Sequence, residues 1–136
     1  MTLLQQAREF ASQMHGNSDC DRHSEEVVSR LSASEDFSRM SPSDQDEISI
    51  VAYLHDVLLH TNASAVEIAR VFGIDILEKV ETLTPRIGES EKEHLRRICT
   101  DPTCRRVHAA VLKTMLSESF GKNSKEILHK LAVLEE

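Results

Sequence analysis

The sequence predicts an all-α fold built as one helical domain. Only four glycines and three prolines occur in 136 residues, which leaves few turn residues for β-hairpins. Apolar residues recur at intervals of three and four along most of the chain, which is the helical period, and alternating β-branched runs are almost absent. The hydrophobic share of 40% and the charged share of 29% are ordinary for a globular protein. We therefore expect residues 1–136 to form a single bundle of about six to eight helices.

Local signals predict where these helices begin and end. A first helix is expected from about Thr2 to His15, ending at Gly16, and a second from near Asp21. Ser41 followed by proline is a typical helix start, so one long helix is expected over 42–59, after a mobile polar connection over 32–46. Further helices are expected over 64–72, 74–83 and 89–99. Another helix is expected to start at Pro102, with an apolar stripe that ends at Met115, and a last one from about Ser124 to Leu134.

Charge and hydropathy exclude several classes of partner. The formal net charge of -7 repels phosphate backbones, so no nucleic-acid partner is expected, and a phosphorylated small molecule would need a local cation. The longest uncharged apolar run, 48–54, is far shorter than the roughly 20 residues that span a bilayer. The N-terminus lacks the basic start of a secretory signal. We expect a cytoplasmic protein with no membrane partner, in which Cys20, Cys99 and Cys104 are reduced thiols.

Three of the expected helices carry a histidine on the face that should meet the core: His23, His55 and His108. Asp56 follows His55 directly and would point about 100° away from it on a continuous helix. Imidazole nitrogens and carboxylate oxygens bind Mn, Fe, Zn and Co ions, and such an ion acidifies its bound water. The pattern alone leaves two interpretations open: one shared metal site, or three separate hydrogen-bonded core histidines.

The spacing of several motifs resembles a known family. The stretch 51–61, VAYLHDVLLHT, precedes IARVFG at 68–73 and VETLT at 80–84, and GES at 88–90 precedes RRVHAAVL at 105–112. This set resembles the HD superfamily of metal-dependent phosphohydrolases, nearest the branch of the stringent-response alarmone hydrolases. The resemblance covers about 3–116 and leaves 121–136 as a C-terminal helix. It implies a helical bundle with one metal, bound by His, an adjacent His-Asp pair and a later Asp, that hydrolyses phosphate esters of nucleotides.

Only part of the family's site carries over to this chain. The resemblance assigns His23, His55 and Asp56 as metal ligands, with Asp56 also catalytic. At the position of the family's later aspartate this chain has Val111, which has no lone pair to offer. Leu59 and His60 stand where the alarmone hydrolases have an acidic pair that orients water. The resemblance therefore implies an HD-type domain with impaired or absent hydrolysis, and with its divalent Mn, Fe, Zn or Co ion retained or lost.

Several alternatives stay open. His108 lies one turn before Val111, on nearly the same helix face, and is a candidate fourth ligand of an active metal-dependent phosphohydrolase, or else a core residue. A third alternative is a helical protein-interaction module with structural histidines. Arg105 and Arg106 are candidates for binding the phosphate of a nucleotide or other phosphorylated small molecule, or pair with surface acids. The amphipathic C-terminal helix either closes the core or pairs two chains in a homodimer.

Overall fold

The computed structural model describes residues 1–16, 19–118 and 123–135, with only the backbone of 19–21. All regular secondary structure in this part of the chain is helical, which confirms the all-α prediction. The described residues form ten helical segments, of which α3 and α5 are four residues long. They are α1 Leu3–His15, α2 Asp19–Ser32, α3 Glu35–Ser38, α4 Pro42–Leu54, α5 Val57–His60, α6 Ala65–Phe72, α7 Ile74–Leu83, α8 Glu91–Cys99, α9 Pro102–Glu118 and α10 Ser124–Leu134.

Capping interactions set several of the helix ends that the sequence predicts. Ser64 and Glu67 form the expected capping box at the start of α6, with Glu67 N donating to Ser64 Oγ at 3.1 Å. Thr2 forms a second capping box with Gln5 at the start of α1. At the end of α1, Gly16 has φ +65°, a left-handed conformation that favours glycine.

The prediction of one long helix over 42–59 is wrong, because the chain turns at His55 and Asp56. The His55 Nδ1–H donates to the carbonyl oxygen of Ala52 at 2.6 Å, and the His55 backbone N–H reaches the same oxygen at 3.4 Å. Asp56 then has φ −121° and ψ 7°, outside the helical region. A side chain that bonds a nearby backbone carbonyl competes with the helical ladder. As a result α5 starts a new axis, on which Leu59 is 52% exposed.

The connection expected over 32–46 is also more ordered than predicted. Its centre forms the single turn α3, where Ser34 Oγ accepts the backbone N–H of Phe37 at 3.2 Å. Its last part is the first turn of α4, which Ser41 caps as expected.

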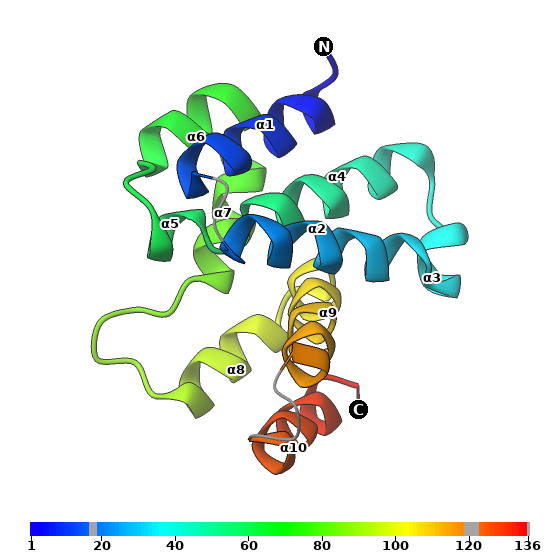
Figure 1. The fold of residues 1–136 in the computed structure, drawn as a ribbon. Helices are drawn as coiled ribbons and strands as arrows, with labels where there is room; N and C mark the ends of the chain where they lie inside the picture. The colour runs from blue at the N-terminus through cyan, green and yellow to red at the C-terminus, as the bar shows by residue number, and fades with distance from the viewer. Residues whose placement is uncertain (17–18, 119–122, 136) are drawn as a thin grey trace.

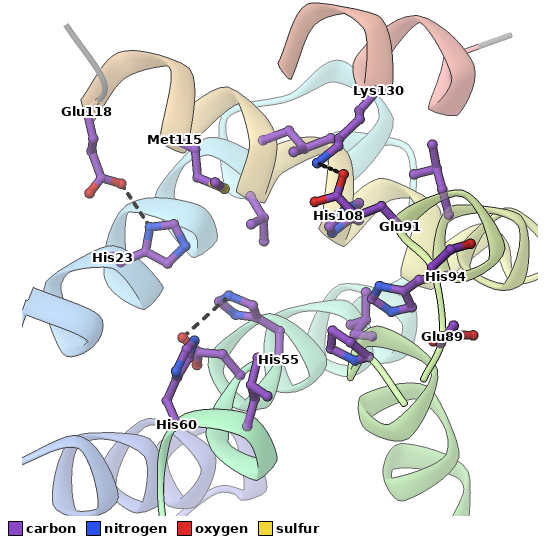
Figure 2. A pocket seen from close by; sticks show the side chains of 18 residues that line it. His23, His55, His60, Glu89, Glu91, His94, His108, Met115, Glu118 and Lys130 are labelled. Atoms are coloured by element: carbon purple, nitrogen blue, oxygen red, sulfur yellow. Dashed lines mark hydrogen bonds and ion pairs between the residues drawn. The ribbon is translucent and has the colours of Figure 1, made fainter. Parts of the chain in front are cut away.

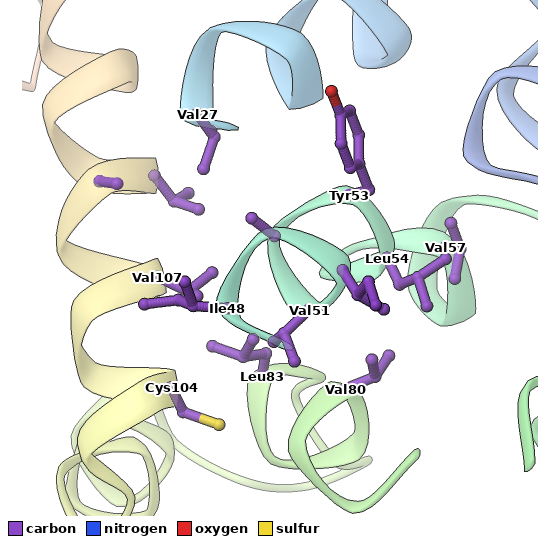
Figure 3. Close-up of a cluster of buried hydrophobic side chains, with 14 of the residues drawn as sticks. Val27, Ile48, Val51, Tyr53, Leu54, Val57, Val80, Leu83, Cys104 and Val107 are labelled. Carbon is purple, nitrogen blue, oxygen red and sulfur yellow. The ribbon is translucent and has the colours of Figure 1, made fainter. Parts of the chain in front are cut away.

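The core forms around α4, whose residues from Ile48 to Leu54 are all buried. Helices α1, α2, α7 and α9 all contact α4, and Figure 1 shows α2 and α4 side by side, with α8, α9 and α10 on one side of them and α1 and α6 on the other. Buried side chains from five helical segments meet there (Figure 3): Val27, Val51, Leu54, Val57, Val80 and Val107. The rings of Phe10 and Phe72 join α1 to α6 edge to face, 5.9 Å apart.

Helices α2 and α9 pack in opposite directions. At one end His23, early in α2, bonds Glu118 at the end of α9, and at the other end Arg30 and Arg105 line one cavity. Helix α10 covers α9 with three of the four residues of its predicted apolar stripe, Ile127, Leu131 and Leu134, which are buried, whereas the fourth, Leu128, is 53% exposed. Residues 121, 122 and 136 of the predicted C-terminal segment lie outside the described part, as does the side chain of Cys20. Among the described helices, none combines the length and apolarity needed to cross a bilayer.

Candidate functional site

A cavity of about 520 Å³ lies between α2, α8, α9 and the turn that joins α4 to α5 (Figure 2). A volume of this size is typical of small-molecule sites. We call it the histidine cavity, because its lining includes all four of the candidate metal ligands and two further histidines: His23, His55, Asp56, His108, His60 and His94.

His23, His55 and Asp56 lie next to one another at one end of this cavity. The ring centroids of His23 and His55 are 5.5 Å apart, with the ring planes tilted by 54°. The Nε2 atom of His55 is 3.8 Å from Asp56 Oδ2. The turn between α4 and α5 explains this closeness, because consecutive residues on a continuous helix would diverge by about 100°. The helix break therefore brings together a His-Asp pair that the sequence predicted to point apart.

Both of these histidines have one ring nitrogen held by a neighbour. His55 Nδ1–H donates to Ala52 O, so Nε2 keeps its lone pair. His23 Nδ1 lies 2.9 Å from Glu118 Oε1, and in the neutral tautomer with its proton on Nδ1, His23 donates to this oxygen and Nε2 carries the lone pair. Metal-binding histidines show this arrangement, with the outer N–H bonded to a carbonyl or carboxylate and the inner nitrogen free.

Asp56 is held in a similar way by a residue that the sequence did not single out, His15. The Nε2 atom of His15 lies 3.1 Å from Asp56 Oδ1, and the His15 side chain is 1% exposed. A signal for this inward position exists, because Ala7, Ala11 and His15 are spaced four apart and both alanines are buried. His15 therefore orients the carboxylate and leaves Asp56 Oδ2 on the side of His55.

His108 lies in the same cavity but beside a different histidine. Its ring centroid is 6.2 Å from that of His94, whose Nε2 donates to Thr82 O at 3.0 Å. Burial lowers the pKa of His108 to about 3 and also lowers the pKa of His94. Both imidazoles are therefore neutral at physiological pH, which is the form that can bind a metal. Within the described residues the imidazole of His108 has no hydrogen-bond partner.

The glutamates that line the histidine cavity are all engaged. Glu118 binds His23, and Glu91 lies 3.5 Å from Lys130. Glu89 accepts two hydrogen bonds of 2.8 Å from Arg97, which lower the pKa of its carboxyl group to about 2. The three positions at which the resemblance would lead one to expect acidic residues also line the cavity: Val111, Leu59 and His60.

The donor atoms fit a divalent transition metal in chemical type but not in number. His23 Nε2, His55 Nε2 and Asp56 Oδ2 make no hydrogen bond to a described residue, and nitrogen with carboxylate oxygen suits Mn, Fe, Zn or Co. Val111 supplies no donor where a fourth ligand was expected. Among the described residues no three His, Cys, Asp or Glu side chains already surround one point as ligands would. A bound ion would therefore need small movements of these rings, with water or a ligand completing its coordination.

The structure does not bring Arg105 and Arg106 to the histidine cavity. Both line another cavity on a different face of α9, and Arg105 Nε donates to the carbonyl oxygen of Leu134 at 2.5 Å.

Comparison with known proteins adds no relative: no family model matches the chain, and no curated protein matches it.

Proposed function

We propose that the chain is an HD-type domain that binds a divalent transition metal and a phosphorylated small molecule in the histidine cavity, with impaired or absent hydrolysis. The observation that carries this proposal is the arrangement of His23, His55 and Asp56. Each of them has one polar atom held by a neighbour, and the three side chains line the same end of the cavity.

Three other groups fix the orientation of the proposed ligands. Glu118 holds His23, the carbonyl of Ala52 holds His55, and His15 holds Asp56. Because the chain has a formal net charge of -7, a bound cation would supply the positive charge that attracts a phosphate ester. The same cation would lower the pKa of a water molecule bound to it. A nucleotide or another phosphorylated small molecule fits the cavity volume of about 520 Å³.

Weak or absent hydrolysis is proposed because no glutamate that lines the cavity is free to act as a base. An efficient base needs a pKa near the working pH and a free lone pair that reaches water. Glu89, with a pKa of about 2 and two bonds to Arg97, is a weak base, and Glu118 is bound to His23. Leu59 offers no basic atom. The expected result is binding of the phosphate ester with little turnover.

A second candidate, an active metal-dependent phosphohydrolase, is favoured by one observation. His108 lines the same cavity with a neutral imidazole that has no hydrogen-bond partner among the described residues. In this alternative His108 is the fourth ligand. We would compare metal affinity in His108→Ala and in His129→Ala, a matched change of an exposed histidine on α10. A loss in His108→Ala alone would support the alternative, and equal affinities would exclude His108 as a ligand.

Thermal melting tests the main proposal. We expect added Mn²⁺ or Zn²⁺ to raise the melting temperature of the wild type, and a nucleotide to raise it by more in the presence of the metal than in EDTA. The metal alone should leave the melting temperature of His55→Ala unchanged, and it should not enlarge the shift that a nucleotide causes in this variant. A wild type that responds to neither metal nor chelator would contradict the proposal and favour a helical interaction module.

The proposal keeps the cytoplasmic location expected from the sequence, to which the free thiols of Cys99 and Cys104 lend support.

A further inference from the structure

A second cavity, of about 470 Å³, lies where the end of α2 and the turn α3 meet the first half of α9 and the end of α10. We call it the arginine cavity, because four of the sixteen lysines and arginines of the chain line it: Arg30, Arg105, Arg106 and Lys113. We propose that the arginine cavity binds a small organic phosphate, held at its phosphate group by Arg30 and Arg106. This inference does not depend on the function proposed for the histidine cavity.

The charge balance of the arginine cavity is opposite to that of the whole chain. Only two acids line it, Asp36 and Glu135, and Glu135 is neutralised by Lys113 at 2.9 Å. The chain as a whole has a formal net charge of -7. A local excess of positive charge on an acidic protein attracts anions to that site, whereas the rest of the surface repels them.

The arginines of this cavity differ in how they are engaged. Arg105 is fixed by its bond to the carbonyl oxygen of Leu134, which joins α9 to the end of α10. Arg30 and Arg106 have no hydrogen bond or ion pair from their side chains to any described residue. Their guanidinium groups therefore keep all their N–H donors for a ligand, and the planar fork of a guanidinium matches two oxygens of a phosphate.

The opposite directions of α2 and α9 explain why these two arginines share a cavity. Arg30 lies in the last turn of α2, and Arg106 lies in the second turn of α9, where the two helices run side by side. One face of α9 lines this cavity, with residues 105, 106, 109, 110 and 113. Another face of α9 lines the histidine cavity, with residues 108, 111, 112 and 115. The two sites are therefore separate although one helix serves both.

The rest of the lining indicates that the ligand has an apolar part. Phe37 and Met40 are half-buried at the edge of the core, and Leu31 and Ala110 are buried. A free inorganic anion would leave these side chains uncovered, whereas a ring attached to the phosphate would bury them. The ligand class is thus a phosphate ester with an apolar or aromatic group, at a volume typical of small-molecule sites.

Binding of adenosine monophosphate tests this inference, measured by calorimetry in EDTA and 0.15 M salt so that the histidine cavity holds no metal. We expect the wild type to bind it more tightly than inorganic phosphate, and adenosine to bind weakly. Arg106→Gln and Arg30→Gln should each weaken binding about tenfold or more, because each removes charge-assisted hydrogen bonds. Arg70→Gln, which removes an exposed arginine on α6, is the matched control, and it should bind as the wild type does, as should His55→Ala.

Three results would overturn the inference. The first is no binding by the wild type, and the second is an equal loss in Arg70→Gln, which would mean attraction to net charge alone. The third is a loss in His55→Ala with normal binding in both arginine variants, which would put the anion in the histidine cavity. Failure of metal binding at the histidine cavity would not affect these measurements, so the two proposals fail separately.

Discussion

The Nε2 atom of His15 lies 3.1 Å from Asp56 Oδ1, and this contact joins the end of α1 to the turn between α4 and α5. Both side chains are largely buried, at 1% and 12% exposed. The direction of the Asp56 carboxylate is therefore set by a residue far away in the sequence. In the proposed metal site His15 is a positioning residue, because it acts through Asp56.

This relationship predicts the effect of His15→Ala. We expect metal affinity to fall roughly 10–100-fold, as is usual when the partner of a ligand is removed. Competition with a chelator of known affinity measures the change, and circular dichroism checks that the helices remain. His129→Ala, at an exposed position on α10, should bind as the wild type does. An unchanged affinity in His15→Ala would mean that this contact only stabilises the fold.

Val111→Asp tests whether a missing ligand limits the site. Val111 is 7% exposed and lines the histidine cavity, so a carboxylate there should lower the melting temperature in EDTA. Added Mn²⁺ should then raise the melting temperature more in the variant than in the wild type, and nucleotide hydrolysis should increase. Equal metal-dependent shifts in the two proteins would show that residue 111 does not reach the ion.

Leu54→Ala tests the central place of α4 in the core. Leu54 is completely buried, so the substitution should lower the free energy of unfolding by about 2–5 kcal/mol, measured in urea. Leu128→Ala is the matched control, because Leu128 is 53% exposed on α10 and its loss should change the free energy by about 0.5 kcal/mol or less. Similar losses in both variants would contradict the described packing.

The pair of Glu89 and Arg97 predicts a dependence of stability on pH. Hydrogen bonds from Arg97 lower the pKa of Glu89 from an ordinary 4.5 to about 2 in the folded chain. Since the folded pKa is the lower one, the pair stabilises the fold above about pH 4.5, and this contribution is lost as the pH falls toward 2. The difference in unfolding free energy between wild type and Glu89→Gln should therefore shrink over that interval. A difference independent of pH would contradict the ion pair.

The sequence predicts the helices well where local interactions decide them. The capping box of Ser64 and Glu67 and the left-handed Gly16 depend on residues within one turn, which a sequence displays directly. The break at His55 could not be predicted in the same way. It depends on a ring that bonds the carbonyl of Ala52, and the apolar stripe around it is that of a continuous helix.

For the candidate site, the sequence indicates residue types better than their partners. The family resemblance assigned His23, His55 and Asp56 to one metal site, and these three side chains line one cavity. It did not indicate His15 or Glu118 as their partners, because both contacts join residues far apart in the chain. Such contacts follow from the packing of α1 on α5 and of α2 on α9, which no local pattern specifies.

Metal content tests the central claim most directly. Purified wild type, His55→Ala and His129→Ala would be analysed side by side for Mn, Fe, Co and Zn after incubation with each ion and removal of the excess. The account predicts about one ion per chain in the wild type and in His129→Ala, and none in His55→Ala, because His55 presents the nitrogen that is not bonded to Ala52 beside Asp56, whereas His129 is exposed on α10. An ion-free wild type, or a His55→Ala variant that keeps its ion, would contradict it.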